Sequence, residues 1–412
     1  MLLDTKGPEI RTGDLSQKQS YKAGDIFKIF VDEQIFEEDG KSLFCDYPFL
    51  IEDGFVGQII EIDSGLFQVE VRKREKNFLE VVAQNDATIG NRRHVNLPGI
   101  RLRLPGITHK DKQDVKFAVE ESMDFIAMSF VRSRANVEEL RKYLRELEAE
   151  HIKIISKIEN EEGIENLDEI IEASDGIMVA RGDLGIEVPI EKLPTYQSDI
   201  VKKTRAQGKF VIIATHLLES MIENPFPTRA EVSDIYNSVI QRADCVMLSG
   251  ETAVGKYPVS SVQVMAATIQ EAEAHVCIEH QDFSANGLTP RDIEKKSLIK
   301  SAIYSGEELG VKALFIFTKS GKLARLASAF RPNLPIYAFT MHLSSVAYMN
   351  VLYGVQPYLL ERWDEDFIEN IYTAIDICKE KHALQTGDKI MIVNDIRKSG
   401  REIPIVELME IT

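Results

Sequence analysis

The chain has 412 residues and carries 66 acidic against 49 basic side chains, a net charge of −17 that excludes a surface made for nucleic acid or anionic lipid. Its hydrophobic content of 44% is enough for several buried cores, so we expect more than one domain. The four cysteines form no CxxC pair, and no apolar run reaches the ~20 residues that span a bilayer. These features indicate a cytoplasmic protein with neither a nucleic-acid nor a membrane partner.

The first part of the chain alternates between apolar and polar residues in short runs separated by Gly and Asp. Runs of this kind occupy 26–31, 58–62 and 67–71. Alternation with a period of two is typical of half-buried strands. The sequence therefore predicts a small all-β module in this part of the chain.

After Gly99 the pattern changes to apolar runs that alternate with amphipathic segments. The apolar runs are predicted strands at 124–130, 153–158, 176–180, 210–214 and 245–248. The segments around them are predicted helices at 111–121, 135–150, 164–173, 191–207 and 230–242. Strands that stay apolar throughout and alternate with helices form parallel sheets covered on both faces. The pattern favours an eight-fold barrel or a doubly wound sheet, although the strands are too few for a closed barrel.

A polar stretch at about 280–296 precedes a third region, which we predict to be a separate α/β domain. Its elements are a helix at 298–309, a strand at 313–318, a helix at 323–330 and strands at 336–339 and 389–393. A loop of hydroxyl, glycine and lysine residues joins the first of these strands to its helix, namely Thr318, Lys319, Ser320, Gly321 and Lys322. Such a loop can surround a phosphate with donors, and a helix start without a ligand is the alternative.

Polar side chains follow the predicted strands of the second region. Lys157 and Glu159 point to the same side because strand side chains alternate, and the next strand leads into Gly182 and Asp183. The glycines there predict a tight turn whose backbone N–H groups face an anion. Two carboxylates without nearby histidines suit Mg²⁺ or Mn²⁺, which take further oxygens from water and substrate. A structural ion pair and an ordinary turn are the alternatives.

Hydroxyl groups stand at the ends of the next two strands, and a polar turn follows the first residues of the chain. Thr215 and Ser249 could bind a carboxylate or relay a proton, or they could cap the helices that follow. Asp4 is a candidate ion ligand, with Lys6 and Arg11 as phosphate partners, unless the turn is a solvated loop. Together these strand ends predict a metal-dependent active site for a small phosphorylated acid.

Six short segments, read in chain order, closely resemble the pyruvate kinase family. They are Asp4–Arg11 (DTKGPEIR), Val95–Gly99 (VNLPG), Ile155–Asn160 (ISKIEN), Val179–Gly185 (VARGDLG), Pro227–Glu231 (PTRAE) and Met247–Ala253 (MLSGETA). The resemblance resumes in the third region at Phe317–Gly321 (FTKSG). It implies transfer of the phosphoryl group of phosphoenolpyruvate to ADP, giving pyruvate and ATP, by a homotetramer.

The family's fold is a (β/α)8 TIM barrel with an inserted β-barrel lid domain and a C-terminal α/β regulatory domain. Applied to this chain, the resemblance places the barrel at 1–8 and 95–279, the lid at 9–94 and the effector domain at 290–412. In the family, two barrel strands and most of a third precede the segment that begins at Asp4. We therefore expect an amino-terminally incomplete barrel, explained either by a start codon placed too far downstream or by a true truncation.

The resemblance also assigns roles to the residues at the strand ends. Glu159 and Asp183 would hold Mg²⁺ or Mn²⁺, and Lys157 would face the transferring phosphoryl group. The backbone of Gly182 and Asp183, together with Thr215, would bind the substrate carboxylate. Thr215 would also help to protonate the enolate, together with Ser249.

Further residues match a potassium site and the nucleotide contacts of the family. Asp4 and the carbonyl of Thr5 match potassium ligands, and Glu9 suits a potassium-dependent member. The residues assigned to ADP or ATP are Lys6, Arg11 and Arg93. Three positions depart from the family pattern without removing its chemistry, namely Arg93, His94 and His216.

Two departures bear on regulation and one on activity. Leu323 replaces a hydroxyl residue and Asn370 stands where some members place a phosphate-binding arginine. We therefore expect a monophosphorylated effector, a sugar phosphate or a nucleoside monophosphate, rather than a sugar bisphosphate.

The short amino terminus leaves a second hypothesis, a truncated and catalytically dead effector-binding or interaction subunit. A third is a carbon–carbon lyase that uses the same carboxylates.

Overall fold

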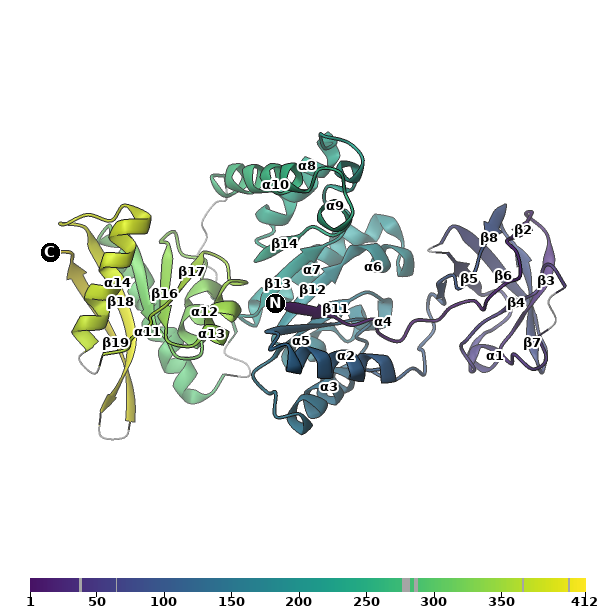
Figure 1. Ribbon diagram of the computed structural model, residues 1–412, viewed down its shortest axis with the longest axis horizontal. Helices are drawn as coiled ribbons and strands as arrows, with labels where there is room; N and C mark the ends of the chain where they lie inside the picture. Colours follow the sequence, from purple (N-terminus) through teal and green to yellow (C-terminus); the bar gives the residue numbers. More distant parts are fainter. Residues whose placement is uncertain (37–38, 64, 276–281, 285–287, 365–366, 399–400) are drawn as a thin grey trace.

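The structure is a computed structural model that describes residues 1–412 except 37–38, 64, 276–281, 285–287, 365–366 and 399–400. Its strands form three separate groups along the molecule (Figure 1). The segment from about residue 10 to residue 96 builds the β-rich part that lies to the right in this view. The first few residues and the middle of the chain build the central part, and the last 120 or so residues lie to the left. None of the described helices is both long and apolar enough to cross a membrane.

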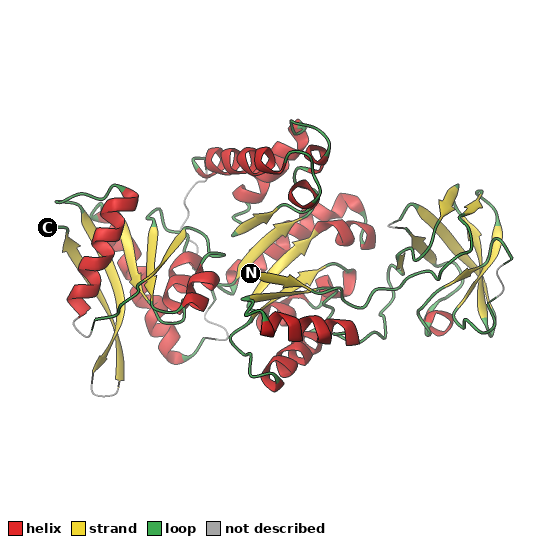
Figure 2. Ribbon diagram, viewed as in Figure 1, coloured by secondary structure: helices red, strands yellow, loops and turns green. Residues whose placement is uncertain are grey.

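The central part is a curled sheet of parallel strands with helices on its outside (Figure 2). The strand order is β1-β10-β11-β12-β13-β14, and every pair in it is parallel. The strands are β1 (Leu2–Asp4), β10 (Phe125–Met128), β11 (Lys153–Ile158), β12 (Gly176–Ala180), β13 (Phe210–Ala214) and β14 (Cys245–Met247). The sheet confirms the α/β fold class with a partial barrel.

The helices of the central part connect these strands, and several of them pack on the outer face of the sheet. They are α2 (His109–Glu120), α3 (Arg134–Glu146), α4 (Glu161–Glu165), α5 (Leu167–Ala173), α6 (Arg181–Glu187), α7 (Leu193–Ala206), α8 (Arg229–Ile240), α9 (Gly250–Ala253) and α10 (Pro258–Glu273). Strand residues alternate between two cores. Ile154, Ile177 and Val211 pack with the outer helices, whereas Ile155 and Met178 face inward. Both faces of the strands are buried, as their continuous apolar character predicts.

Residues from β2 to β9 form the predicted all-β module. Its main sheet has the order β4-β3-β7-β6-β5-β9, and β2 pairs with β8. The strands are β2 (Gln19–Tyr21), β3 (Ile26–Phe30), β4 (Leu43–Phe44), β5 (Ile59–Ile62), β6 (Phe67–Arg74), β7 (Phe78–Ala83), β8 (Ala87–Ile89) and β9 (Val95–Asn96), with one short helix, α1 (Leu50–Asp53). Alternate residues of β6 and β7 are buried in one core, which explains the period of two in the sequence.

The third part is a five-stranded sheet in the order β17-β16-β15-β18-β19 with helices packed on it. Its strands are β15 (Ala313–Phe317), β16 (Ile336–Thr340), β17 (Val355–Leu359), β18 (Lys389–Lys398) and β19 (Arg401–Glu410). Its helices are α11 (Pro290–Glu308), α12 (Lys322–Ala329), α13 (Leu343–Met349) and α14 (Phe367–His382). Only β19 runs antiparallel to its neighbour among these paired strands.

Several predicted element bounds were wrong. The polar stretch 290–296 belongs to helix α11, which begins with a capping box between Thr289 and Asp292 and has Pro290 in its first turn. The remaining predicted linker includes 280–281 and 285–287, which lie outside the described residues, as does the predicted barrel boundary at 279. The predicted helix 164–173 is two helices, α4 and α5, that meet at Asn166.

A buried ion pair joins the central part to the third part. Arg331 Nη1 lies 2.8 Å from Asp244 Oδ1, with the two side chains 6% and 4% exposed. The guanidinium also stacks over the ring of Tyr353 and donates to the carbonyl of Arg242. Asp244 in turn accepts the backbone N–H of Val211 in β13. The pair therefore links the start of a central strand to the loop after α12.

The change Arg331→Met is expected to lower the free energy of unfolding by about 3–5 kcal/mol, because it leaves a buried carboxylate without its cation. Urea unfolding followed by circular dichroism measures the loss. The matched control is Lys203→Met, since Lys203 forms an exposed pair with Asp168 that contributes about 0–1 kcal/mol. Equal stability of the two variants would contradict the structural role of the pair.

Candidate active site

The ends of β1, β10 and β11 bring together the first group of predicted site residues. Lys157 Nζ lies 3.0 Å from Glu159 Oε1, 3.1 Å from Asp4 Oδ1 and 2.9 Å from the hydroxyl of Ser129. The lysine side chain is 12% exposed and Glu159 only 1%. The parallel pairing of β10 with β1 and β11 sets this cluster, because it brings their carboxyl ends to one edge.

Glu159 is a buried carboxylate on which the positive charge of Lys157 and the negative charge of Asp183 both act. Burial raises its pKa to about 7, Lys157 and the backbone N–H of Phe130 act in the opposite sense, and the charge of Asp183 raises it further. The N–H of Phe130 donates to Glu159 Oε2 at 2.6 Å. A cation placed between Glu159 and Asp183 would relieve both the desolvation and the repulsion. The oxygen donors of these two residues suit Mg²⁺ or Mn²⁺.

Ser129 is a site residue that the sequence analysis missed. Its hydroxyl donates to the carbonyl of Thr5 at 2.7 Å and accepts from Lys157, and its N–H donates to Thr5 Oγ1 at 3.0 Å. It follows the apolar run of β10, the same signal that identified the other strand ends. Gly7 makes this contact with the amino-terminal segment sterically feasible, because it has φ +72° and an added Cβ would lie 2.9 Å from Ser129 Cβ.

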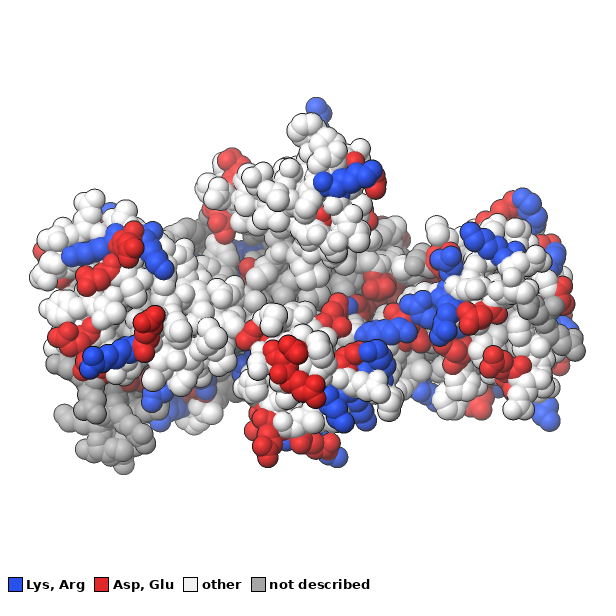
Figure 3. Space-filling view, viewed as in Figure 1, with Lys and Arg blue, Asp and Glu red and all other residues white. Residues whose placement is uncertain are grey.

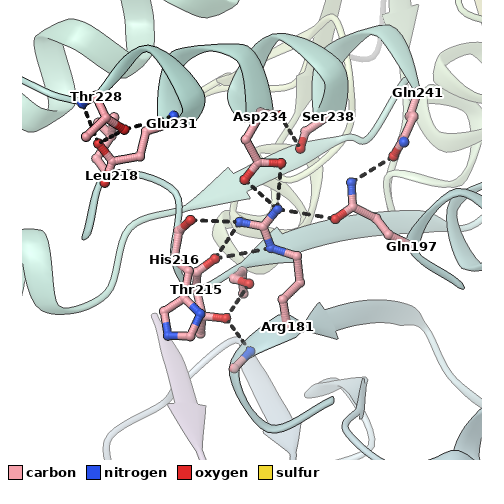
Figure 4. A network of polar contacts seen from close by, with 12 residues as sticks. Arg181, Gln197, Thr215, His216, Leu218, Thr228, Glu231, Asp234, Ser238 and Gln241 are labelled. Atoms are coloured by element: carbon pink, nitrogen blue, oxygen red, sulfur yellow. Dashed lines mark hydrogen bonds and ion pairs between the residues drawn. The ribbon is translucent and has the colours of Figure 1, made fainter. Parts of the chain in front are cut away.

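A buried guanidinium organises the ends of β12 and β13 (Figure 4). Arg181 donates to the carbonyl of Thr215 at 2.6 Å, to that of His216 at 3.1 Å and to both oxygens of Asp234 at 2.7 and 2.9 Å. Thr215 and His216 have φ values of +69° and +54°, which are unusual for residues with a side chain. The guanidinium therefore holds a strained turn, and through Asp234 it ties that turn to α8.

The hydroxyl of Thr215 faces the start of α6, as shown in Figure 4. Its Oγ1 accepts the N–H of Gly182 at 2.8 Å. The predicted tight turn after β12 was wrong, because helix α6 begins at Arg181 directly after the strand and neither of its glycines has a positive φ. The N–H groups of the first helical turn have no partner within the helix, as at any helix start.

Ser249 lies at the end of β14, where a buried carboxylate fixes the backbone. Glu251 is fully buried and accepts the N–H of Ser249 at 2.8 Å with one oxygen and that of Leu218 at 2.9 Å with the other. It therefore connects the end of β14 to the loop after β13. The hydroxyl of Ser249 forms no hydrogen bond with the described residues, so it is available to a ligand.

The residues predicted to bind a nucleotide lie where β1 continues into the β-rich part. Lys6 and Arg11 both pair with Glu9, at 3.4 and 2.7 Å. Arg93 lies on a neighbouring segment, which is joined to this one by a backbone bridge between Arg11 and His94. Its Nη1 lies 3.3 Å from Asp63 Oδ1. Figure 3 shows basic and acidic side chains mixed on this face of the molecule.

Comparison with known proteins decides the family. The model of the pyruvate kinase barrel domain matches residues 1–262, and that of the pyruvate kinase alpha/beta domain matches 296–402. The chain belongs to the pyruvate kinase family. It is 40% identical to pyruvate kinase 2 of Trypanosoma brucei brucei over 95% of the chain and 80% of the relative. It is 43% identical to pyruvate kinase of Bacillus licheniformis over 86% of the chain, and spans 61% of that protein.

A pyruvate kinase of Geobacillus stearothermophilus is a third relative, 40% identical over 95% of this chain and 67% of its own length. Pyruvate kinases are phosphotransferases of glycolysis, and the family generally depends on Mg²⁺ and K⁺. Among the residues that the structure describes, no group of three His, Cys, Asp or Glu side chains could hold a metal ion. A divalent ion at Glu159 and Asp183 would therefore need oxygens from water or substrate.

The predicted effector loop lines a cavity of about 310 Å³ in the third part. Four of its five residues contribute, namely Thr318, Lys319, Ser320 and Lys322. Gly321 has φ +76° and caps α12. Asn370 is 2% exposed and exchanges hydrogen bonds with the backbone of Asp364 at 2.8 and 2.9 Å. Asn370 thus supports the backbone at Asp364, and the identity of the effector stays a prediction.

Glu187 gives the site region a pH-dependent stability. Its side chain accepts a hydrogen bond from Asn96 Nδ2 at 2.6 Å, and burial raises its pKa to about 7. Because the folded pKa exceeds the usual value of 4.5, the folded chain binds more protons between about pH 4.5 and 7. The contribution of Glu187 to stability is complete below pH 4.5 and is lost as the pH rises through the folded pKa of about 7.

From pH 4.5 to pH 8, the free energy of unfolding of Glu187→Gln should therefore rise by about 1–3 kcal/mol relative to that of the parent, since glutamine never carries the buried charge. Thermal unfolding at both pH values measures the difference. Glu191→Gln on the exposed turn before α7 is the control and should follow the parent at each pH. A gain of the same size in the control would refute the assignment to Glu187.

Proposed function

We propose that this chain catalyses transfer of the phosphoryl group of phosphoenolpyruvate to ADP, giving pyruvate and ATP. The observation that carries this is the position of Lys157, which is nearly buried between Glu159 and Asp4 at the carboxyl edge of the sheet. A fixed positive charge at such a rim lowers the energy of a transition state in which charge develops on phosphoryl and enolate oxygens. Membership of the pyruvate kinase family supports phosphoenolpyruvate and ADP as the substrates.

Glu159 and Asp183 are the proposed ligands of Mg²⁺ or Mn²⁺. Both offer carboxylate oxygens, and the pKa of Glu159 is raised chiefly by burial, with the charge of Asp183 acting in the same direction. When bound, the ion would neutralise phosphoryl oxygens and polarise the substrate. Lys157 would contribute the second positive charge, on the side of the phosphoryl group.

The substrate carboxylate is proposed to bind between α6 and the end of β13. The backbone N–H groups of Gly182 and Asp183 stand at the start of α6, and Thr215 is held against them by its contact with Gly182. Ser249, whose hydroxyl is free of described partners, would supply or relay a proton to the enolate carbon together with Thr215. Arg181 acts as a positioning residue through the carbonyl of Thr215.

The other bound species also remain proposals. Asp4 and the Thr5 carbonyl are proposed to bind K⁺, although both contact protein groups here. The nucleotide set is Lys6, Arg11 and Arg93, and an ADP phosphate would replace Glu9 as the partner of Arg11. The division into a barrel of 1–8 and 95–279, a lid of 9–94 and an effector domain of 290–412 stays a prediction, as do the homotetramer and the cytoplasmic location.

An assay with phosphoenolpyruvate, ADP, Mg²⁺ and K⁺ tests the reaction. We expect pyruvate only when ADP and a divalent ion are present, because the carboxylate pair needs a cation to bind the phosphoryl group. Pyruvate formed without ADP would favour a lyase. A folded chain that binds the effector and produces no pyruvate would favour the dead subunit, for which the comparisons give no support.

The change Lys157→Met should lower kcat roughly 10²–10³-fold, since it removes a charge that stabilises the transition state. Steady-state kinetics with a circular dichroism spectrum of each variant measure this. Lys203→Met, on the exposed face of α7, is the control and should keep the parent's kcat. A Lys157→Met chain with more than half the parent's kcat would rule out the proposed role.

Lys319 provides the test of the effector loop. Titration of activity with a sugar monophosphate, a nucleoside monophosphate and a sugar bisphosphate should show that a monophosphate lowers the KM for phosphoenolpyruvate and that the bisphosphate is no better. In Lys319→Met the response should need roughly tenfold more effector, because one charge-assisted contact is lost. Lys312→Met, at the other end of β15, is the control. An unchanged KM for phosphoenolpyruvate with every effector would contradict the proposal.

A further inference from the structure

A second polar cavity lies between the central sheet and the third part, at the opposite ends of the strands from the active site. Its volume is about 300 Å³. On one side it is lined by Lys153 at the start of β11 and by Lys209 just before β13. On the other side are Arg325 of α12 and Tyr348 of α13. We call it the interface cavity and define it by these four residues.

The three cations of the interface cavity have no acidic partner among the described residues. Lys153 Nζ lies 5.6 Å from the ring centroid of Tyr348 and forms no hydrogen bond or ion pair with the described residues. Lys209 donates to three backbone carbonyls at 2.6, 2.8 and 2.7 Å. Arg325 Nη1 donates to the carbonyl of Gly208 at 2.7 Å. Carbonyl oxygens satisfy these donors but carry no negative charge, and Asp175 and Glu172 act on Lys209 without forming an ion pair with it.

The carboxylates that border the interface cavity are engaged with cations elsewhere. Asp175 pairs with Arg141 at 3.1 Å and accepts the N–H of Ile154. Glu172 pairs with Arg134 at 2.9 Å. The cavity therefore keeps an excess of positive charge although its lining contains two acids.

Tyr348 adds a hydroxyl without a partner. The side chain is 8% exposed, and its OH forms no hydrogen bond with any residue that the structure describes. Burial raises the pKa of this hydroxyl, so it is a proton donor at neutral pH. Burial also lowers the pKa of Lys209 to about 8, which an anion nearby would oppose. A hydroxyl without a described partner and cations without an acidic partner, all facing one cavity, are groups that a bound anion would satisfy.

We propose that the interface cavity binds a small phosphorylated anion, held by Lys153, Arg325 and the hydroxyl of Tyr348. A phosphate group presents several acceptor oxygens and up to two negative charges, which matches donors that come from different sides. The volume is at the small end of the range for ligand pockets, so it suits phosphate or a short phosphate ester.

The proposed site is distinct from the effector loop and from the active site. None of its four defining residues lines the cavity at Thr318 and Lys319. The two cavities nevertheless share Ser320 and Lys322, so one loop separates them. The proposal does not depend on catalysis by the chain, because it concerns binding at the interface alone.

Acetylation of lysines, read by mass spectrometry, tests the site in the whole parent chain. Inorganic phosphate and glycerol 3-phosphate should each slow the acetylation of Lys153, while succinate at equal concentration should not. The same protection should occur in Lys319→Met, which alters the effector loop. In Tyr348→Phe, protection of Lys153 should need roughly tenfold more phosphate, because one hydrogen bond to a charged group is lost.

Three results would overturn the proposal. Absence of protection at Lys153 in the parent chain would show that phosphate does not bind in the interface cavity, and this result needs no variant to fold. Protection that vanishes in Lys319→Met would assign the binding to the effector loop. Equal protection by succinate would show that the cavity responds to negative charge without selecting a phosphoryl group.

Discussion

Parallel pairing in a single register is the constraint on which both ends of the central sheet depend. Met128 pairs with Ser156, Ile158 with Val179 and Ala180 with Ala214, so the residues that follow these strands emerge at one edge. A slip of one residue would turn Lys157 to the opposite face of its strand and separate it from Asp4. The buried apolar residues on both faces prevent that slip, because every one of them would also change sides.

Charge at the carboxyl edge is organised around two buried cations. Lys157 offsets Glu159 and Asp4, and Arg181 offsets Asp234 while it holds the turn at Thr215. Residues with positive φ cost about 1–3 kcal/mol each, so the turn exists because the guanidinium donates hydrogen bonds to its carbonyls. Glu159 nevertheless remains a desolvated carboxylate on which the charge of Asp183 acts, and a divalent cation would relieve both effects.

The central strands and the pair formed by Lys157 and Glu159 could be predicted because the signal is local. Apolar runs mark strands buried on both faces, and residues two apart in a strand share a side. The contact of Arg181 with Asp234 spans 53 positions and leaves no mark in either segment. Ser129 had the same local signal as the other strand ends and was overlooked. Residue roles for ligands stay predictions.

Local patterns also failed where the third sheet is less apolar. Strand β17 reads Val-Gln-Pro-Tyr-Leu, and its middle residues are only partly buried, so neither an apolar run nor a clean alternation identified it. Strand β19 alternates charged and apolar residues at the edge of the sheet and pairs only with β18. Both are edge strands, where pairing with one neighbour replaces burial on two faces.

Two strands, β11 and β13, carry functional candidates at both ends, which places the interface cavity in a defined relation to the active site. In β11 the cavity residue Lys153 and the site residue Lys157 are four residues apart, a span of about 13 Å. Lys209 precedes β13, and Thr215 follows it. Strands packed on both faces move as units rather than bending between well-packed neighbours. An anion bound by Lys153 and Arg325 would therefore act on the strand that carries Lys157, without any contact with the substrate.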